Sequence, residues 1–174
     1  MIKKTYIILS NFFYSLKIKE FLELVILPFI FTAIIYVVCN TSINDFNKFV
    51  DDFTNMVISI TAILGAFSLA TLSIIITSSN NNIEFAKKEL TQRKDRLKKN
   101  ITYYKLQVLR NFFSLFLLFG LLLYSIVFKF VQNVISNINI LFYVEVYMLM
   151  VAVISQVFVI QSMYFLFVEP KTNK

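Results

Sequence analysis

The chain has 174 residues and a net charge of +7, and it is 58% hydrophobic but only 16% charged. A soluble domain has roughly 45–50% apolar and about 25% charged residues, so this chain lacks the polar residues that would cover a soluble core. It contains no histidine and one cysteine, Cys39, which excludes Ser-His hydrolysis and an intrachain disulfide. Its two glycines are too few for a phosphate-binding loop, and its acidic residues are few and scattered. We therefore expect no cofactor, no metal site and no enzymatic activity.

A short apolar run, Thr5 to Leu16, comes first and has two lysines on each side. It is too short to span a bilayer, and no signal-peptide cleavage site follows it. We predict that residues 1–20 form an N-terminal cytoplasmic segment with a helix lying in the membrane interface. The alternative is that this run extends the first membrane span.

Four longer apolar segments follow, each close to the 20 or so residues that a membrane-spanning helix needs. Pro28 lies in the first of them, and we place it in the opening turns, where a missing amide donor is tolerated. The sequence thus predicts an all-α integral membrane protein, a bundle of four transmembrane helices. The predicted spans are residues 21–40, 56–78, 111–130 and 145–168, with external loops at 41–55 and 131–144, a basic cytoplasmic segment at 79–110 and a cytoplasmic tail at 169–174.

The basic residues predict the orientation. Fifteen of the seventeen lysines and arginines lie before the first predicted span, between the second and third, or after the fourth. The other side has only Lys48 and Lys129, and its first loop is acidic. The positive-inside rule therefore places both termini and the basic segment in the cytoplasm. The abundance of Lys, Asn, Ile and Phe is typical of AT-rich bacterial genes, so the expected location is the bacterial inner membrane.

The basic segment has a helical pattern. Apolar residues from Ile83 to Val108 recur at steps of three, four and seven. The pairs Glu84–Lys88, Glu89–Arg93 and Asp95–Lys99 put an acid four residues before a base, the favourable order on a helix. This pattern predicts a basic amphipathic helix after the second span, with the third span beginning near Ile101 in a continuous helix.

Three interpretations of this charge are open. The basic residues set the orientation and contact anionic lipid headgroups, or they form a docking surface for an acidic cytosolic protein. Direct nucleic-acid binding, with Tyr103 and Tyr104 stacking on bases, is the least favoured of the three. The candidate partner- or lipid-binding residues are Lys87, Lys88, Arg93, Lys94, Arg96, Lys98 and Lys99.

Small and polar residues within the spans suggest helix contacts. Small side chains let helices approach closely in lipid, where packing drives association. In the second span they mark either a homo-oligomer interface or packing within one subunit. In the fourth span, glutamines must face protein or water, since an amide facing lipid loses its hydrogen bonds. The candidate residues are Ser59, Ala62, Gly65, Ala66, Ala70, Ser73, Gln156 and Gln161.

Other polar residues bear on transport. Thr61, Ser68, Thr71 and Thr77 could line a pore, although such hydroxyls commonly bond to their own backbone one turn back. We expect Glu145, at the outer edge of the fourth span, to be solvated. No acidic residue is then left deep in a span, which counts against a cation-coupled transporter.

The stretch GAFSLATLSIIITSSNNNIEFAKKEL, where a span rich in small residues runs into a polar segment, resembles the KwaA membrane subunits of the Kiwa anti-phage system. This resemblance, carried by layout, implies an inner-membrane oligomer that senses phage attack and recruits a cytosolic DNA-binding effector. The leading hypothesis is therefore a non-enzymatic oligomeric scaffold or sensor. The alternatives are an ion channel or membrane-disrupting effector and, third, a small transporter.

Overall fold

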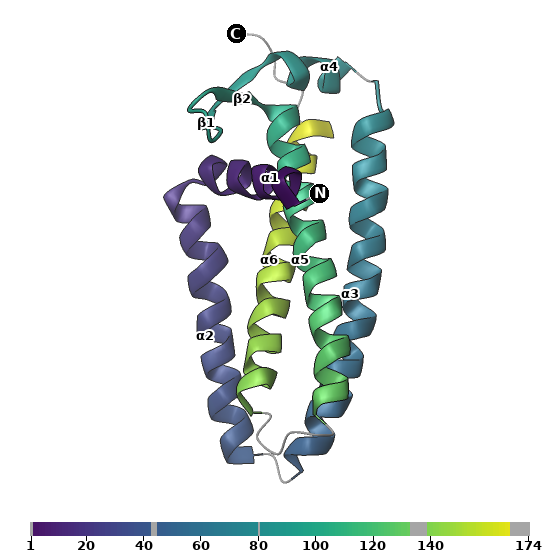
Figure 1. Ribbon diagram of the computed structural model, residues 1–174. Coiled ribbons are helices and arrows are strands. Elements are labelled where there is room, and N and C mark those ends of the chain that lie inside the picture. The colour runs from purple at the N-terminus through teal and green to yellow at the C-terminus, as the bar shows by residue number, and fades with distance from the viewer. Residues whose placement is uncertain (1, 43–44, 80, 133–138, 168–174) are drawn as a thin grey trace.

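The structure is a computed structural model that describes the chain except for residues 1, 43–44, 80, 133–138 and 168–174 (Figure 1). The predicted tail at 169–174 lies outside the described residues. The elements in chain order are α1 (Ile2–Ser15), α2 (Ile18–Ser42), α3 (Phe46–Thr77), α4 (Asn81–Lys88), β1 (Leu90–Lys94), β2 (Asn100–Thr102), α5 (Tyr103–Val131) and α6 (Asn139–Phe167).

Four of the described helices, α2, α3, α5 and α6, are long and apolar enough to cross a membrane. The prediction of a mainly helical membrane protein with four such segments is confirmed. α3 begins ten residues before the predicted second span, so residues 46–55 of the expected loop are helical. Asp45 explains this start, because its side chain accepts a hydrogen bond from the Lys48 amide at 3.2 Å and caps the helix.

α5 is the central helix of the bundle. It packs against α3 on one side and α6 on the other, and α2 packs against α6 at the periphery (Figure 1). The middle of the α3–α5–α6 interface is an apolar layer, and the buried hydroxyl of Thr61 lies beside it. The buried apolar members are Val57, Leu118, Leu121, Leu149 and Ala152.

Pro28 lies in the interior of α2 rather than in its opening turns, because α2 begins at Ile18. At that position proline removes one hydrogen bond of the helix. Thr32 one turn later donates its hydroxyl to the Pro28 carbonyl at 2.8 Å. The expected placement of Pro28 was wrong because the basic and acidic residues from Ile18 to Glu23 join the helix.

α1 is a separate helix that lies across the bundle instead of running along it (Figure 1). The helix breaks at Leu16 and Lys17, so α1 does not extend α2. Phe12, which is 1% exposed, stacks on Phe113 of α5 with ring centroids 3.7 Å apart. This packing holds α1 against the bundle, and its place in a membrane interface stays a prediction.

The long amphipathic helix predicted after the second span is replaced by a short helix and a hairpin. α4 ends at Lys88, and β1 and β2 then form an antiparallel pair. The apolar stripe is divided, since Ile83, Ala86 and Ile101 are buried while Leu90 and Leu97 are 60% and 67% exposed. The expectation that the third span starts inside the basic segment agrees with α5, which begins at Tyr103.

Asp95 explains why this segment turns instead of continuing as a helix. Its carboxylate accepts hydrogen bonds from the amides of Leu97 (2.9 Å) and Lys99 (3.1 Å) and from the Lys105 ammonium (3.1 Å). Aspartate commonly bonds nearby amides in this way and so favours turns over helices. Lys98 completes the turn with a left-handed backbone, at φ 58°. The pairing expected between Asp95 and Lys99 thus uses the lysine amide rather than its ammonium group.

These contacts also affect the ionisation of Asp95. Burial acts to raise its pKa, but the hydrogen bonds from the Lys99 amide, Lys105 and the Leu97 amide outweigh burial and hold the pKa below its ordinary value of 3.8. The folded state therefore favours the ionised form. The stabilisation is fully present above about pH 3.8 and is lost as the pH falls through the lower, folded value.

Replacing Asp95 by alanine is expected to open the hairpin tip while leaving the helices intact. The loss of three hydrogen bonds to a buried carboxylate costs about 1–3 kcal/mol of local stability. Hydrogen–deuterium exchange should show faster exchange from Leu90 to Thr102. Gln92→Ala, an exposed change in β1, is the control, and equal exchange in the two variants would contradict this role for Asp95.

Candidate functional site

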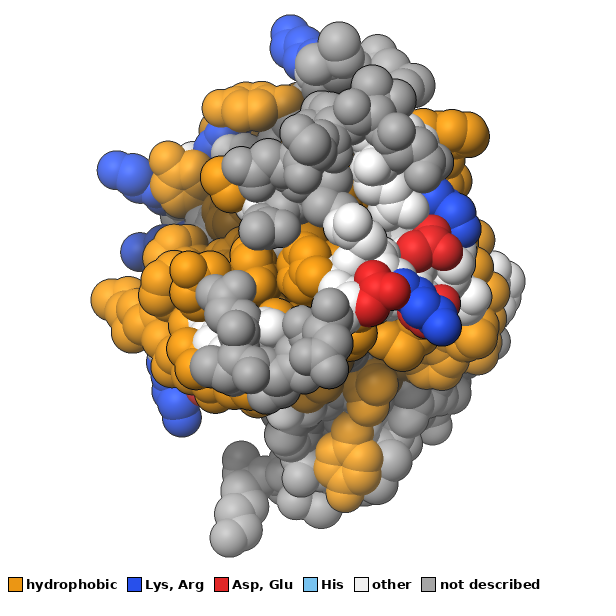
Figure 2. Space-filling model, turned by 90° about the horizontal axis from the view of Figure 1, so that it is seen from below, with side chains coloured by type: hydrophobic (Ala, Val, Ile, Leu, Met, Phe, Trp, Pro, Cys, Tyr) orange, Lys and Arg blue, Asp and Glu red, His pale blue; other side chains and the backbone are white. Residues whose placement is uncertain are grey.

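One end of the bundle carries nearly all of the described positive charge. We call it the basic end, and it consists of α1, the first turn of α2, α4, the β1–β2 hairpin and the first two turns of α5 (Figure 1). With Lys17 in the link between α1 and α2 included, every described lysine and arginine except Lys48 and Lys129 belongs to it. Figure 2 looks at the opposite end, where apolar side chains dominate and the few acidic groups lie beside a basic one.

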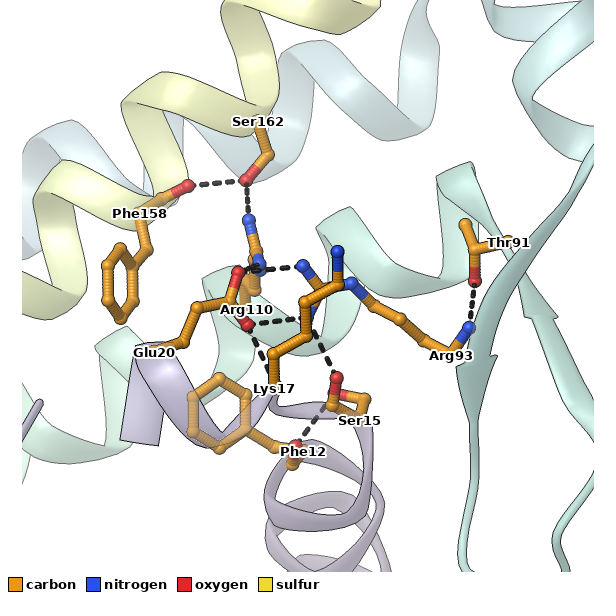
Figure 3. A network of polar contacts seen from close by, with 9 residues as sticks. All are labelled: Phe12, Ser15, Lys17, Glu20, Thr91, Arg93, Arg110, Phe158 and Ser162. Carbon is orange, nitrogen blue, oxygen red and sulfur yellow. Dashed lines mark hydrogen bonds and ion pairs between the residues drawn. The ribbon is translucent and has the colours of Figure 1, made fainter. Parts of the chain in front are cut away.

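The basic end is held together by one carboxylate between two guanidinium groups (Figure 3). Glu20 of α2 accepts two hydrogen bonds from Arg93 of β1, at 2.5 and 2.7 Å, and one from Arg110 of α5 at 2.7 Å. Arg93 also donates to the Ser15 carbonyl at 2.9 Å, and Arg110 donates to Ser162 of α6 at 2.7 Å. The network therefore joins α1, α2, the hairpin, α5 and α6.

This network is strong because its groups are largely withdrawn from solvent. The side chains of Glu20, Arg93 and Arg110 are 18%, 15% and 8% exposed. Bidentate pairing of arginine with a carboxylate gives short, charge-assisted bonds of fixed geometry. Removing one member would leave the remaining buried charge without its partner, which costs more than the pair itself contributes.

The structure separates the predicted basic residues into two groups. Arg93 points inward and serves the Glu20 network, so it is not part of a docking surface. The other six are exposed: Lys87, Lys88, Lys94, Arg96, Lys98 and Lys99. Leu90 and Leu97 are exposed among them, so this surface combines cationic groups with apolar side chains.

Two of the exposed basic residues have partners that orient them. Lys87 pairs with Glu84 at 3.0 Å, and this hydrogen bond and charge hold the pKa of Glu84 below its ordinary value. The Arg96 guanidinium lies 5.9 Å from the centre of the Tyr6 ring, and its amide donates to Asn11 at 3.2 Å. The hairpin is therefore packed against α1 rather than projecting freely.

Sequence reasoning missed Glu20, Arg110 and Ser162 as members of one site. Glu20 falls in the predicted N-terminal segment 1–20 and Arg110 in the predicted basic segment 79–110, and neither was a candidate site residue. The available signal was an acid at the start of an apolar segment that is otherwise preceded by lysines. Nothing in the spacing pairs Glu20 with an arginine 73 or 90 residues away.

The small residues of α3 and the glutamines of α6 have different environments. Gln156 is 3% exposed and donates to Ser68 of α3 at 2.9 Å, and Ser68 in turn bonds to Asn111 of α5. Gln161 is exposed. The small-residue face is also turned outward: Ser59, Ala62, Ala66, Ala70 and Ser73 are exposed and Gly65 is half-buried.

The four α3 hydroxyls considered as pore-lining groups differ in their hydrogen bonding. Thr71 and Thr77 bond to the carbonyls of Phe67 and Ser73 in their own helix, both at 2.8 Å. Ser68 joins the interhelical bonds described above, and Thr61 is 2% exposed.

Glu145 is not solvated, contrary to expectation. Its side chain is 0% exposed, and Thr54 donates a hydrogen bond to it at 2.9 Å. The expectation failed because α6 begins at Asn139, so Glu145 lies almost two turns inside the helix and faces α3. A span thus does contain an internal acid.

The fold and these sites define a multi-pass membrane protein with a basic, hairpin-bearing end. The chain matches no protein-family model and shows no significant similarity to a curated protein or a solved structure. The proposals that follow therefore depend on the chain's own residues and, for the role in defence, on the resemblance in layout described above.

Glu20→Gln is expected to release the hairpin from α2 and α5. Two arginines lose their counter-charge, which should cost about 1–3 kcal/mol in this partly exposed setting. Limited trypsin digestion of the protein in lipid nanodiscs should then cut faster at Lys94, Lys98 and Lys99. The matched control is Glu23→Gln, whose carboxylate lies 3.9 Å from the exposed Lys19. Equal cleavage of the two variants would show that Glu20 does not hold the hairpin.

Proposed function

We propose that the chain is a non-enzymatic, oligomeric scaffold or sensor of the bacterial inner membrane that recruits an acidic cytosolic protein to its basic end. The observation that carries this proposal is the display of six exposed basic side chains at one end of the bundle. They lie on and beside a hairpin whose inward-facing residue, Arg93, is fixed by Glu20.

The orientation in this proposal follows from charge. Of the described basic residues, only Lys48 and Lys129 lie away from the basic end, and the positive-inside rule puts the richer side in the cytoplasm. Both termini would then be cytoplasmic. Anionic lipid headgroups would contact the lysines nearest the bilayer, each interaction contributing about 1 kcal/mol.

The hairpin is better suited to a protein partner than a uniformly charged helix would be. Its tip is ordered by Asp95, and Leu90 and Leu97 supply apolar contact area next to Lys94 and Lys98. Complementary charge steers a partner and suppresses wrong ones, while buried apolar side chains add affinity. Tyr103 and Tyr104, the residues considered for base stacking, belong to the start of α5 instead of the hairpin tip.

Charge reversal tests recruitment. Lys94→Glu/Lys98→Glu/Lys99→Glu should abolish co-purification of a stoichiometric soluble partner from the native host while leaving membrane insertion intact. Arg93 is kept, because reversing it would place a second acid against Glu20. The control is Lys3→Glu/Lys4→Glu, also exposed and at the same end. If a partner is retained equally by both variants, it does not dock on the hairpin.

The exposed small residues of α3 support the oligomeric part of the proposal. Within the described residues, Ser59, Ala62, Ala66, Ala70 and Ser73 stay exposed, so internal packing does not explain their size. They border an open apolar groove between α3 and α5. Its two sides are formed by Ala62, Gly65 and Ala66 and by Leu118, Phe119 and Leu122. A second copy could approach closely here, as helices do at small-residue faces in lipid.

Gly65→Leu is expected to disrupt the oligomer without unfolding the subunit. A Cβ atom at Gly65 would have no neighbouring atom within 4 Å in the chain, and Gly120 has the same freedom. Gly120→Leu is therefore a matched control for the added volume and helix propensity. Native mass spectrometry should give smaller assemblies for Gly65→Leu alone. Identical masses for both variants and the wild type would remove this face from the interface.

The channel alternative receives less support from the bundle. An apolar layer separates the polar groups near Glu145 from those near Gln156. These apolar side chains disfavour a wet path along α3, α5 and α6 within one subunit, and the buried Thr61 hydroxyl is the polar group that a channel would use at this level. The hydroxyls of Thr71 and Thr77 also donate hydrogen bonds to carbonyl groups of α3 itself.

The role in anti-phage defence is supported by the resemblance to KwaA subunits. It implies that the recruited protein is a DNA-binding effector. The charge-reversed variant should then lose protection of a phage-challenged host, whereas Lys3→Glu/Lys4→Glu should keep it.

A further inference from the structure

Glu145 is the most unusual charged group that the proposed function leaves unused. It is 0% exposed, belongs to the membrane-length segment Ile140–Tyr164 and lies where α3, α5 and α6 meet. An ionisable side chain within a membrane span is costly and is retained where it binds or moves something.

The polar atoms around Glu145 are incompletely bonded. Thr54 donates to one carboxyl oxygen, Oε2, at 2.9 Å. The other oxygen, Oε1, has no hydrogen-bond partner, and neither does the hydroxyl of Ser125, although both atoms are buried. Ser125 of α5 lies within hydrogen-bonding reach of this same carboxyl group. Its hydroxyl and Oε1 do not reach full hydrogen-bond geometry, so two oxygens on neighbouring helices meet here with at most a weak bond between them.

No positive side chain neutralises Glu145 in the part of the chain that the structure describes. On α3 the nearby ionisable group is Asp51, which pairs with Lys129 of α5 at 3.6 Å. Tyr124 of α5 faces the carboxyl group but donates its hydroxyl to the Leu141 carbonyl at 2.8 Å. α2, which packs on the other side of α6, brings the Cys39 thiol and Tyr36 to Tyr143 rather than to Glu145.

We propose that Glu145, Thr54 and Ser125 form a binding site for one small monovalent cation, a proton or a sodium ion. The site has a single negative charge, so one positive charge neutralises it, whereas a divalent ion would leave an uncompensated charge in the span. All the atoms that could coordinate a cation here are oxygens, the ligand type that hard cations prefer. The inference is independent of partner recruitment, since the site is at the opposite end of the bundle.

Either cation would satisfy the unpartnered atoms. When Oε1 carries a proton, it can donate a hydrogen bond to the Ser125 hydroxyl oxygen, while Thr54 continues to donate to Oε2. A sodium ion would instead be coordinated by the carboxylate and the two hydroxyl oxygens. The bound cation joins α3, α5 and α6, so its occupancy should stabilise this end of the bundle.

The test is thermal unfolding of the full chain in lipid nanodiscs, measured over a range of pH in sodium chloride and in N-methylglucamine chloride at equal ionic strength. If sodium binds, the wild-type midpoint should rise by about 3–5 °C for each tenfold increase in sodium concentration above the dissociation constant. If only a proton binds, the midpoint should rise as the pH falls and should not respond to sodium. Both outcomes support the site.

Glu145→Gln should lose the response that the wild type shows, because its amide keeps the shape but not the charge. Ser125→Ala keeps the carboxylate and should move the response to a higher cation concentration, so the test holds if the glutamine variant does not fold. Asp52→Asn, an exposed acid of α3, should respond as the wild type does. A purely structural role would shift the midpoint equally in all solutions. Identical pH and sodium responses in Glu145→Gln and the wild type would overturn the proposal.

Discussion

The Glu20 carboxylate is the group on which the arrangement of the basic end depends. Without it, Arg93 and Arg110 would lie together with their like charges unopposed, and the hairpin would have no ionic connection to α2. With it, one side chain connects α2, β1 and α5, and through Ser15 and Ser162 the network reaches α1 and α6. The remaining basic side chains are free to face outward because the inward-facing ones are neutralised.

The second constraint is that polar groups inside an apolar bundle must find partners. Ser68, Asn111 and Gln156 bond to one another, and Thr71 and Thr77 bond to carbonyl groups of α3. Some buried polar atoms keep no partner, among them Asn111 Nδ2, Gln156 Oε1 and Glu145 Oε1, and Glu145 differs from the two amides because it is a carboxyl group inside a span. The two polar regions lie on either side of the apolar layer, so each end of the bundle has its own chemistry.

The long helices could be predicted because a membrane imposes a length and a composition on each segment separately. No knowledge of neighbours was needed to recognise the apolar runs that became α2, α3, α5 and α6. The basic segment was different, since its residues suit a helix and a hairpin almost equally well. The inward orientation of Arg93 depends on Glu20, which lies 73 residues earlier in the chain. The role of Asp95 depends on backbone amides that come close to its carboxylate only once the turn has formed. Glu145 was misjudged for a related reason, because its distance from the helix start depended on where α6 begins.

Apolar content and the positions of the basic residues thus determined the class of the protein, the number of long helices and the expected orientation. These properties are additive along the chain and need no contact between distant residues. Only the tertiary structure decided which charges face inward, which small residues stay uncovered and which acid is buried. Each of those outcomes depends on a partner from another helix, and the energy of a buried charge or hydrogen bond exists only when that partner is in place.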